Sequence, residues 1–168
     1  MNKFQTNRLT IRELLNDDLK DLSIVLSDPE IMRFSTVGVH TRTQLLDYIQ
    51  RCTEQYKTQE YGRWGIFTTF NNEFIGLCGL TLEDDELVHI NYRLASKSHG
   101  KGFATETVIG LIEYAKNVLN AKAITASIEP ENVNSIKVVE RSGFVLKGQS
   151  TFKGFDVNIY QVKFQSEI

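Results

Sequence analysis

The sequence predicts a mixed α/β domain with a mostly antiparallel central sheet of about seven strands, flanked by about four helices. Three strand-like runs follow one another in the middle of the chain, which favours antiparallel pairing. A strand–helix–strand unit over residues 87–128 favours one parallel pair nearby. Of the 168 residues, 41% are hydrophobic and 24% charged, as is typical of a soluble globular domain. We therefore expect residues 1–168 to form a single domain.

The first part of the chain predicts one strand followed by helices. Residues 8–12 alternate polar and apolar side chains, which indicates a strand. Asn16 or Asp17 is expected to begin a helix that continues to about Leu26. After a short helical turn at residues 28–30 and a loop over 34–40, apolar side chains on one face predict a longer helix over about 41–58.

The middle and the end of the chain supply most of the expected strands. Strands over 64–70 and 74–82 are joined by a hairpin turn at Asn71–Asn72, and the acidic turn 83–86 leads into a strand over 87–95. The remaining predicted elements are a helix over 105–118, a strand over 123–128, a helix from Glu131 or Asn132 to Arg141, and a hairpin of strands 144–147 and 158–164. Gly143 suits the left-handed end of the last helix.

A glycine-rich stretch, Lys97 to Thr105, lies between the strand over 87–95 and the following helix. Glycine lets the backbone approach a ligand closely and adopt positive φ. A helix start also leaves N–H groups without partners and carries partial positive charge. The stretch therefore predicts either a phosphate site or a tight turn that needs glycine only for its geometry.

Charge and composition argue against several classes of function. The net charge of −2 gives no support for binding nucleic acid or an anionic membrane surface. No apolar run is long enough to span a membrane, and residues 1–8 lack the apolar core of a signal peptide, so we expect a cytoplasmic protein. Cys52 and Cys78 are expected to be free thiols, and the three histidines show no metal-ligand spacing.

Three motifs together resemble a known family. They are Gly100–Lys101–Gly102–Phe103–Ala104–Thr105–Glu106, the segment Glu131–Ile136 through Arg141–Phe144, and Phe74–Leu80. In this order and spacing they resemble the GNAT N-acetyltransferases, most closely the RimJ/RimL-type branch, over nearly the whole chain. The resemblance implies acetyl-CoA as the acetyl donor and no metal. Lys97 stands where the family pattern has Gln or Arg.

The resemblance also implies which residues bind acetyl-CoA. The strands over 87–95 and 123–128 are expected to diverge, with the pantetheine arm between them, paired with the backbone near Arg93 and Leu94. Asn132 is expected to bond the pantetheine amide or to cap its helix. The residues expected to hold the pyrophosphate through backbone amides are His99, Gly100, Lys101, Gly102, Phe103, Ala104 and Thr105.

Two residues are candidates for acid–base chemistry. His89 fills a position, three residues before Tyr92, where many relatives have a carboxylate; it is either a general base or a packed strand residue. Acidic residues of the turn 83–86 are rivals for that role. Many GNAT enzymes have a tyrosine as acid where this chain has Val139, so Ser135 is the candidate for assisting the thiolate, or else it bonds only to local backbone.

The acceptor is the least specified part of the prediction. Phe34, Tyr61 and Trp64 are candidates for lining its site, although Trp64 equally suits the core. We expect acetyl transfer to a primary amine by direct attack in a ternary complex, with a protein N-terminus as the leading acceptor. A small amine, an amino acid or an antibiotic remains an alternative acceptor, as does a catalytically silent acyl-CoA-binding module. The chain is expected to be a monomer or a homodimer.

Overall fold

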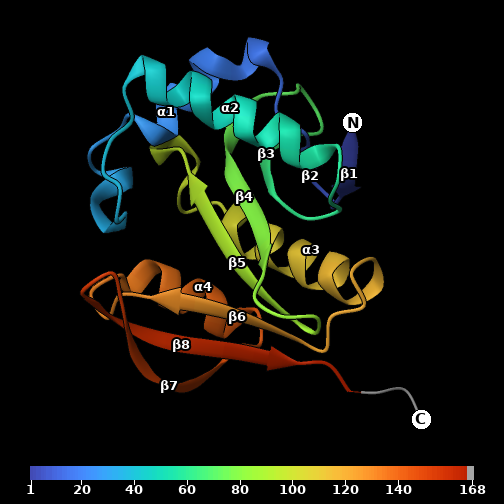
Figure 1. Cartoon of the computed structure of the whole chain (residues 1–168), viewed down its shortest axis with the longest axis vertical. Helices are drawn as coiled ribbons and strands as arrows, with labels where there is room; N and C mark the ends of the chain where they lie inside the picture. The colour runs from blue at the N-terminus through green and yellow to red at the C-terminus, as the bar shows by residue number, and fades with distance from the viewer. Residues whose placement is uncertain (166–168) are drawn as a thin grey trace.

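The computed structural model describes residues 1–165 and contains one continuous sheet with helices on both faces (Figure 1). The strands are β1 (Asn2–Gln5), β2 (Leu9–Arg12), β3 (Arg63–Thr68), β4 (Phe74–Leu82), β5 (Leu87–Leu94), β6 (Ala123–Ile128), β7 (Val145–Phe152) and β8 (Phe155–Lys163). The α-helices are α1 (Leu19–Leu26), α2 (Arg42–Tyr56), α3 (Phe103–Asn117) and α4 (Val133–Arg141), with single 3-10 turns η1 (Asn16–Asp18), η2 (Ile31–Phe34) and η3 (Ser96–Ser98).

The strand order is β1-β2-β3-β4-β5-β6-β8-β7, and β5–β6 is the one parallel pair in it. The predicted fold class is confirmed, but the sheet has eight strands rather than about seven. The additional strand, β1, is short and pairs with β2 at the edge of the sheet. Its Phe4 packs against Trp64 and against Tyr114 of α3, so tertiary contacts hold a segment that has no strand pattern of its own.

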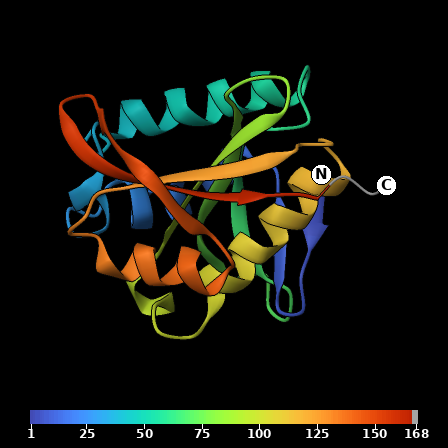
Figure 2. The ribbon, with the colours of Figure 1, turned by 90° about the horizontal axis from the view of Figure 1, so that it is seen from below.

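The helices form two layers, with the sheet between them (Figure 2). On one face, α1 and α2 cover a core that includes Leu22, Ile49 and Leu77. The opposite face carries α3 and α4 over the larger core, which includes Trp64 and Leu111. Burial of these apolar faces supplies most of the drive for the fold. Among residues 1–165, no helix is both long and apolar enough to cross a membrane.

The parallel pair β5–β6 separates part-way along its length. Its pairing covers Leu87 to His89 on β5 and Ala123 to Thr125 on β6, and stops there. Beyond this point β5 stays paired with β4 as far as Leu94, while β6 stays paired with β8 as far as Ile128. Figure 1 shows the two strands diverging. Each therefore presents a free edge to the other, and such edges are sites where another extended chain can pair.

Candidate active site

The turn that leads into α3 has the geometry of an anion site. Gly100 and Gly102 have φ of 73° and 80°, and Gly102 is the N-cap of the helix, with no side chain bonded to the first turn. A Cβ at Gly100 would meet no atom within 4 Å, and at Gly102 the nearest would be Arg8 Nη2 at 3.4 Å. The first backbone amides of α3 therefore have no side-chain cap, and an uncapped helix start fits a pyrophosphate group.

This glycine turn is fastened to the loop between β1 and β2. The Glu106 carboxylate accepts hydrogen bonds from the Thr6 hydroxyl (2.6 Å), from the Arg8 backbone N–H (2.7 Å) and from Arg8 Nε (2.7 Å). Arg8 Nη1 also donates to the Lys101 carbonyl at 3.0 Å. Burial raises the pKa of Glu106, but these hydrogen bonds and the charge of Arg8 outweigh it and hold that pKa below its usual range. Glu106 therefore positions the turn.

Two side chains beside the glycine turn point away from the expected pyrophosphate position. Lys97 makes an exposed ion pair with Glu73 at 2.5 Å. His99 donates a hydrogen bond from Nε2 to the carbonyl of Leu94 at 2.9 Å. An anion at this turn would therefore be held by backbone amides rather than by these two side chains.

The free edge of β5 is formed by alternate residues. The Ala95 N–H bonds to Ile75 of β4, so Leu94, one residue away, directs its backbone groups to the other side. By the same alternation the backbone of Arg93 is directed at β4, so pantetheine pairing near Arg93 and Leu94 would use the residues on either side of Arg93. The edge groups belong to Leu94 and Tyr92 instead. The Arg93 side chain lies on the face of the sheet covered by α2, opposite Leu77 in the register.

His89 lies where β5 and β6 separate. Its Nδ1 is 3.1 Å from the hydroxyl of Thr125, its partner in the register, and 3.4 Å from a carboxylate oxygen of Glu83. Burial lowers the pKa of His89, the Glu83 charge raises it, and the charge of Arg63 lowers it further, with a net lowering. The imidazole is therefore neutral at neutral pH, which is the form that can accept a proton.

The start of α4 faces the same free edge. Asn132 is the N-cap, and its side chain accepts a hydrogen bond from the Ser135 N–H at 3.3 Å, which supports the capping alternative for Asn132. The Tyr92 hydroxyl, from β5, donates to the Ser135 carbonyl at 3.2 Å. Burial raises the pKa of Tyr92 to about 12, and the Ser135 side chain, as a hydrogen-bond partner of the Tyr92 hydroxyl, opposes that rise.

Two observations bear on the chemistry available here. Val139, at the position of the usual acid, is fully buried in the core. Cys52 and Cys78 are buried free thiols, and burial raises the pKa of Cys52 to about 11 and that of Cys78 further still. A thiol held in its protonated form is a poor nucleophile, so neither cysteine suits a covalent intermediate.

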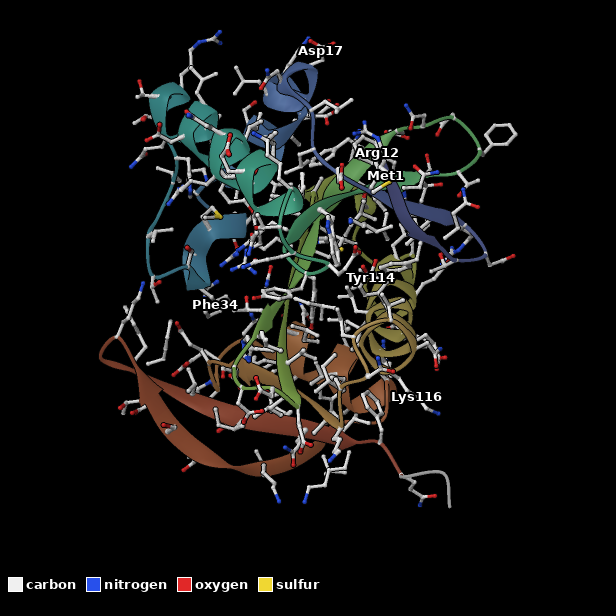
Figure 3. The ribbon with its side chains drawn as sticks, turned by 45° about the vertical axis from the view of Figure 1, so that its right-hand side comes forward. Met1, Arg12, Asp17, Phe34, Tyr114 and Lys116 are labelled. Atoms are coloured by element: carbon white, nitrogen blue, oxygen red, sulfur yellow. The ribbon has the colours of Figure 1, made fainter. Side chains whose placement is uncertain are left out.

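The three aromatic acceptor candidates are not brought together. Trp64 is fully buried on the face covered by α3, where its ring lies 5.2 Å from that of Tyr114, so the structure favours the core alternative for Trp64. Tyr61 is half-buried against the same core. Phe34 ends η2 and is half-buried on the other side of the molecule, between α2 and the β7–β8 hairpin (Figure 3). Of the three, Phe34 alone lies on the side of the sheet that carries the His89 side chain.

Residues 8–145 match the family described as the acetyltransferase (GNAT) domain. The chain belongs to the GNAT acetyltransferases. It is 33% identical to an uncharacterized N-acetyltransferase, p20, of Bacillus licheniformis, over 95% of this chain and 94% of that protein. In this GNAT chain, β5 and β6 separate beside the glycine turn at the start of α3.

Solved structures of similar fold contain coenzyme A. RimL, a ribosomal L7/L12 alpha-N-protein acetyltransferase solved with coenzyme A, has a TM-score of 0.81 at 18% identity and covers 97% of this GNAT chain and 98% of its own. The aminoglycoside acetyltransferase AAC(6')-Ib, solved with paromomycin and acetyl-CoA, has a TM-score of 0.78 at 21% identity and covers 94% of each chain. These neighbours establish a shared fold, and they differ in the acceptor that each is named for.

Proposed function

We propose that this GNAT protein transfers the acetyl group of acetyl-CoA to a primary amine, and that both substrates are bound at once. The observation that carries the proposal is the separation of β5 from β6 at His89, with the glycine turn of α3 at the far end of the gap. The resemblance to the RimJ/RimL-type branch makes a protein N-terminus the leading acceptor. Acetyl-CoA would extend from the amides of residues 99–105 along the free edge at Leu94.

In the proposed reaction the neutral amine attacks the thioester carbonyl carbon directly. The C–N bond forms, the C–S bond breaks, and one proton passes from the amine to the departing thiolate. His89 accepts the amine proton, directly or through water, because its lowered pKa keeps it neutral. The Ser135 hydroxyl donates a hydrogen bond to the thiolate. Direct attack also agrees with the protonated, buried state of Cys52 and Cys78.

An acceptor screen tests this proposal. The protein is mixed with acetyl-CoA and a panel of peptides, amino acids, polyamines and aminoglycosides, with release of thiol and gain of an acetyl mass on the acceptor as readouts. We expect catalytic turnover of at least one amine. Saturable binding of coenzyme A without turnover of any amine would instead identify a silent binding module, the alternative that the valine at position 139 leaves open.

A further inference from the structure

Two arginines and an asparagine form a polar row on the face of the sheet covered by α2. Arg63 of β3 is paired with Gly79 of β4, and Gly79 with Asn91 of β5, so the three lie side by side across the strands. Arg93 is two residues beyond Asn91 and therefore projects from the same face. Glycine at the centre is required, because a Cβ at Gly79 would lie 2.3 Å from the Gly62 carbonyl and 3.2 Å from Arg63 Cδ.

Hydrogen-bond donors in this row are buried without acceptors. Arg63 Nη1 and Asn91 Nδ2 are both shielded from solvent and have no partner among residues 1–165. Within the same residues, neither Arg63 nor Arg93 has a carboxylate within 4.0 Å, whereas Arg8 and Arg12 each have one. A buried charge without a partner is costly, so an arrangement of this kind is expected to acquire an anion.

The surroundings of the row do not compensate its positive charge. Burial lowers the pKa of Arg93, and the charge of Arg63 lowers it further, while Tyr48 of α2 acts in the opposite direction. The Tyr48 phenol is itself kept neutral, because burial raises its pKa. The two guanidinium groups are thus close enough to repel each other, and no anionic group of the described chain offsets that repulsion.

The row is adjacent to the proposed catalytic position. His89 and Asn91 are alternate residues of β5 on one face, so their Cα atoms are about 7 Å apart. A molecule whose amine approaches His89 can therefore place a second group against Arg63, Asn91 and Arg93. Planar guanidinium groups match a carboxylate through paired hydrogen bonds. They repel a polycation such as an aminoglycoside.

We infer that the acceptor carries a carboxylate near its reactive amine, and that Arg63, Arg93 and Asn91 bind this carboxylate. The inference rests on the proposed function for the position of the amine. It covers a free amino acid and a peptide N-terminus with an acidic residue, which share this chemistry. Among the acceptors that GNAT proteins of this fold could use, we therefore expect the anionic ones.

Matched pairs of acceptors test the inference. β-Alanine is compared with β-alaninamide, and a peptide amide with Glu at its second position is compared with the same peptide with Gln there. Wild-type kcat/KM is expected to be about 10- to 100-fold higher for the carboxylate member of at least one pair, the range expected for charged hydrogen bonds. The pair that shows the preference distinguishes an amino acid from a peptide.

Variants of the row assign the preference to its residues. Arg63→Gln and Arg93→Gln are each expected to remove most of the preference through a higher KM for the acceptor, with the KM for acetyl-CoA unchanged. Arg51→Gln, on the exposed surface of α2, is the matched control and is expected to keep it. The inference would be overturned by equal turnover of both acceptors of each pair, or by better turnover of a phosphorylated or cationic amine. It would also be overturned if the preference for the carboxylate persisted in both arginine variants.

A binding measurement separates this inference from the proposed function. Glutarate, which has no amine, is titrated with the protein while the melting temperature is recorded. It is expected to raise the melting temperature of the wild type and of Arg51→Gln, but not of Arg63→Gln or Arg93→Gln. Stabilisation by glutarate without turnover of any amine would refute the catalytic proposal alone. Turnover with no effect of carboxylate in either measurement would refute the carboxylate site alone.

Discussion

Replacing Glu83 with glutamine is expected to move the pH dependence of catalysis to lower pH. The Glu83 carboxylate lies 3.4 Å from His89 Nδ1 and opposes the lowering of the His89 pKa by burial. At that distance, opposite charges in a water-like dielectric attract by about 1.2 kcal/mol, close to one pH unit in a pKa. The Glu83 side chain is 42% exposed, so salt and solvent weaken the interaction. We therefore expect the His89 pKa to fall in Glu83→Gln, by less than the full attraction would give.

The assay is kcat/KM for the acceptor against pH, measured with saturating acetyl-CoA. Where both the acceptor amine and His89 must be neutral, log kcat/KM rises with a slope of two below the pKa of His89 and with a slope of one between that pKa and the pKa of the amine. The wild-type break is expected below about pH 6.5, because the pKa of His89 is lowered. In Glu83→Gln the break moves to lower pH, and in Arg63→Gln it moves to higher pH.

A variant that lacks the imidazole serves as the control for this profile. His89→Ala is expected to show a single slope of one throughout, since only the amine then titrates. An unchanged break in both charge variants, or a break that persists in His89→Ala, would refute the assignment of His89 as the base.

Further predictions concern the two substrates and the strand contacts. His89→Ala should lower kcat by roughly 10²- to 10⁴-fold with the affinity for coenzyme A nearly intact, and wild-type turnover would end the base assignment. Ser135→Ala should lower kcat more than it weakens coenzyme A binding; equal losses, or none, would leave Ser135 a purely structural role. Glu106→Gln should flatten the dependence of melting temperature on pH below about pH 4.5, since a lowered carboxyl pKa stabilises the folded state above that range and the stabilisation is lost as the pH falls. Gly76→Ala should destabilise the fold and push β4 away from β5, because its Cβ would lie 2.4 Å from the carbonyl of Arg93. An unaltered midpoint of unfolding in denaturant would contradict this packing.

The strands that could be predicted from sequence are those with apolar side chains in the core. The bounds of β4 and β6 agree with the sequence prediction, since both are bounded by turn residues and are largely buried. The strand β7 continues to Phe152, well beyond its predicted end at residue 147, because it is a fully exposed edge strand defined by pairing with β8 alone. No periodicity of hydrophobic residues marks such a strand.

The candidate site was predictable where one continuous segment forms it. The glycine turn at Gly100 and Gly102 is a local feature, and the structure gives both residues the positive φ that glycine permits. Arg63 and Asn91, by contrast, are distant in sequence and meet only through the register of three strands. Sequence patterns specify which face of a strand a residue occupies, but not which residue lies beside it two strands away.

Titration of coenzyme A by calorimetry, with Gly102→Glu and Gly154→Glu as a matched pair, tests whether the turn at the start of α3 binds the pyrophosphate. Both glycines have left-handed φ, 80° and 82°, so both variants carry similar backbone strain and the same added charge. Gly102 begins α3, whereas Gly154 is in the β7–β8 turn. We expect saturable binding by the wild type and Gly154→Glu, and a loss of at least about 100-fold in affinity in folded Gly102→Glu, where a carboxylate faces the pyrophosphate. Wild-type affinity in folded Gly102→Glu would contradict a pyrophosphate site at this turn.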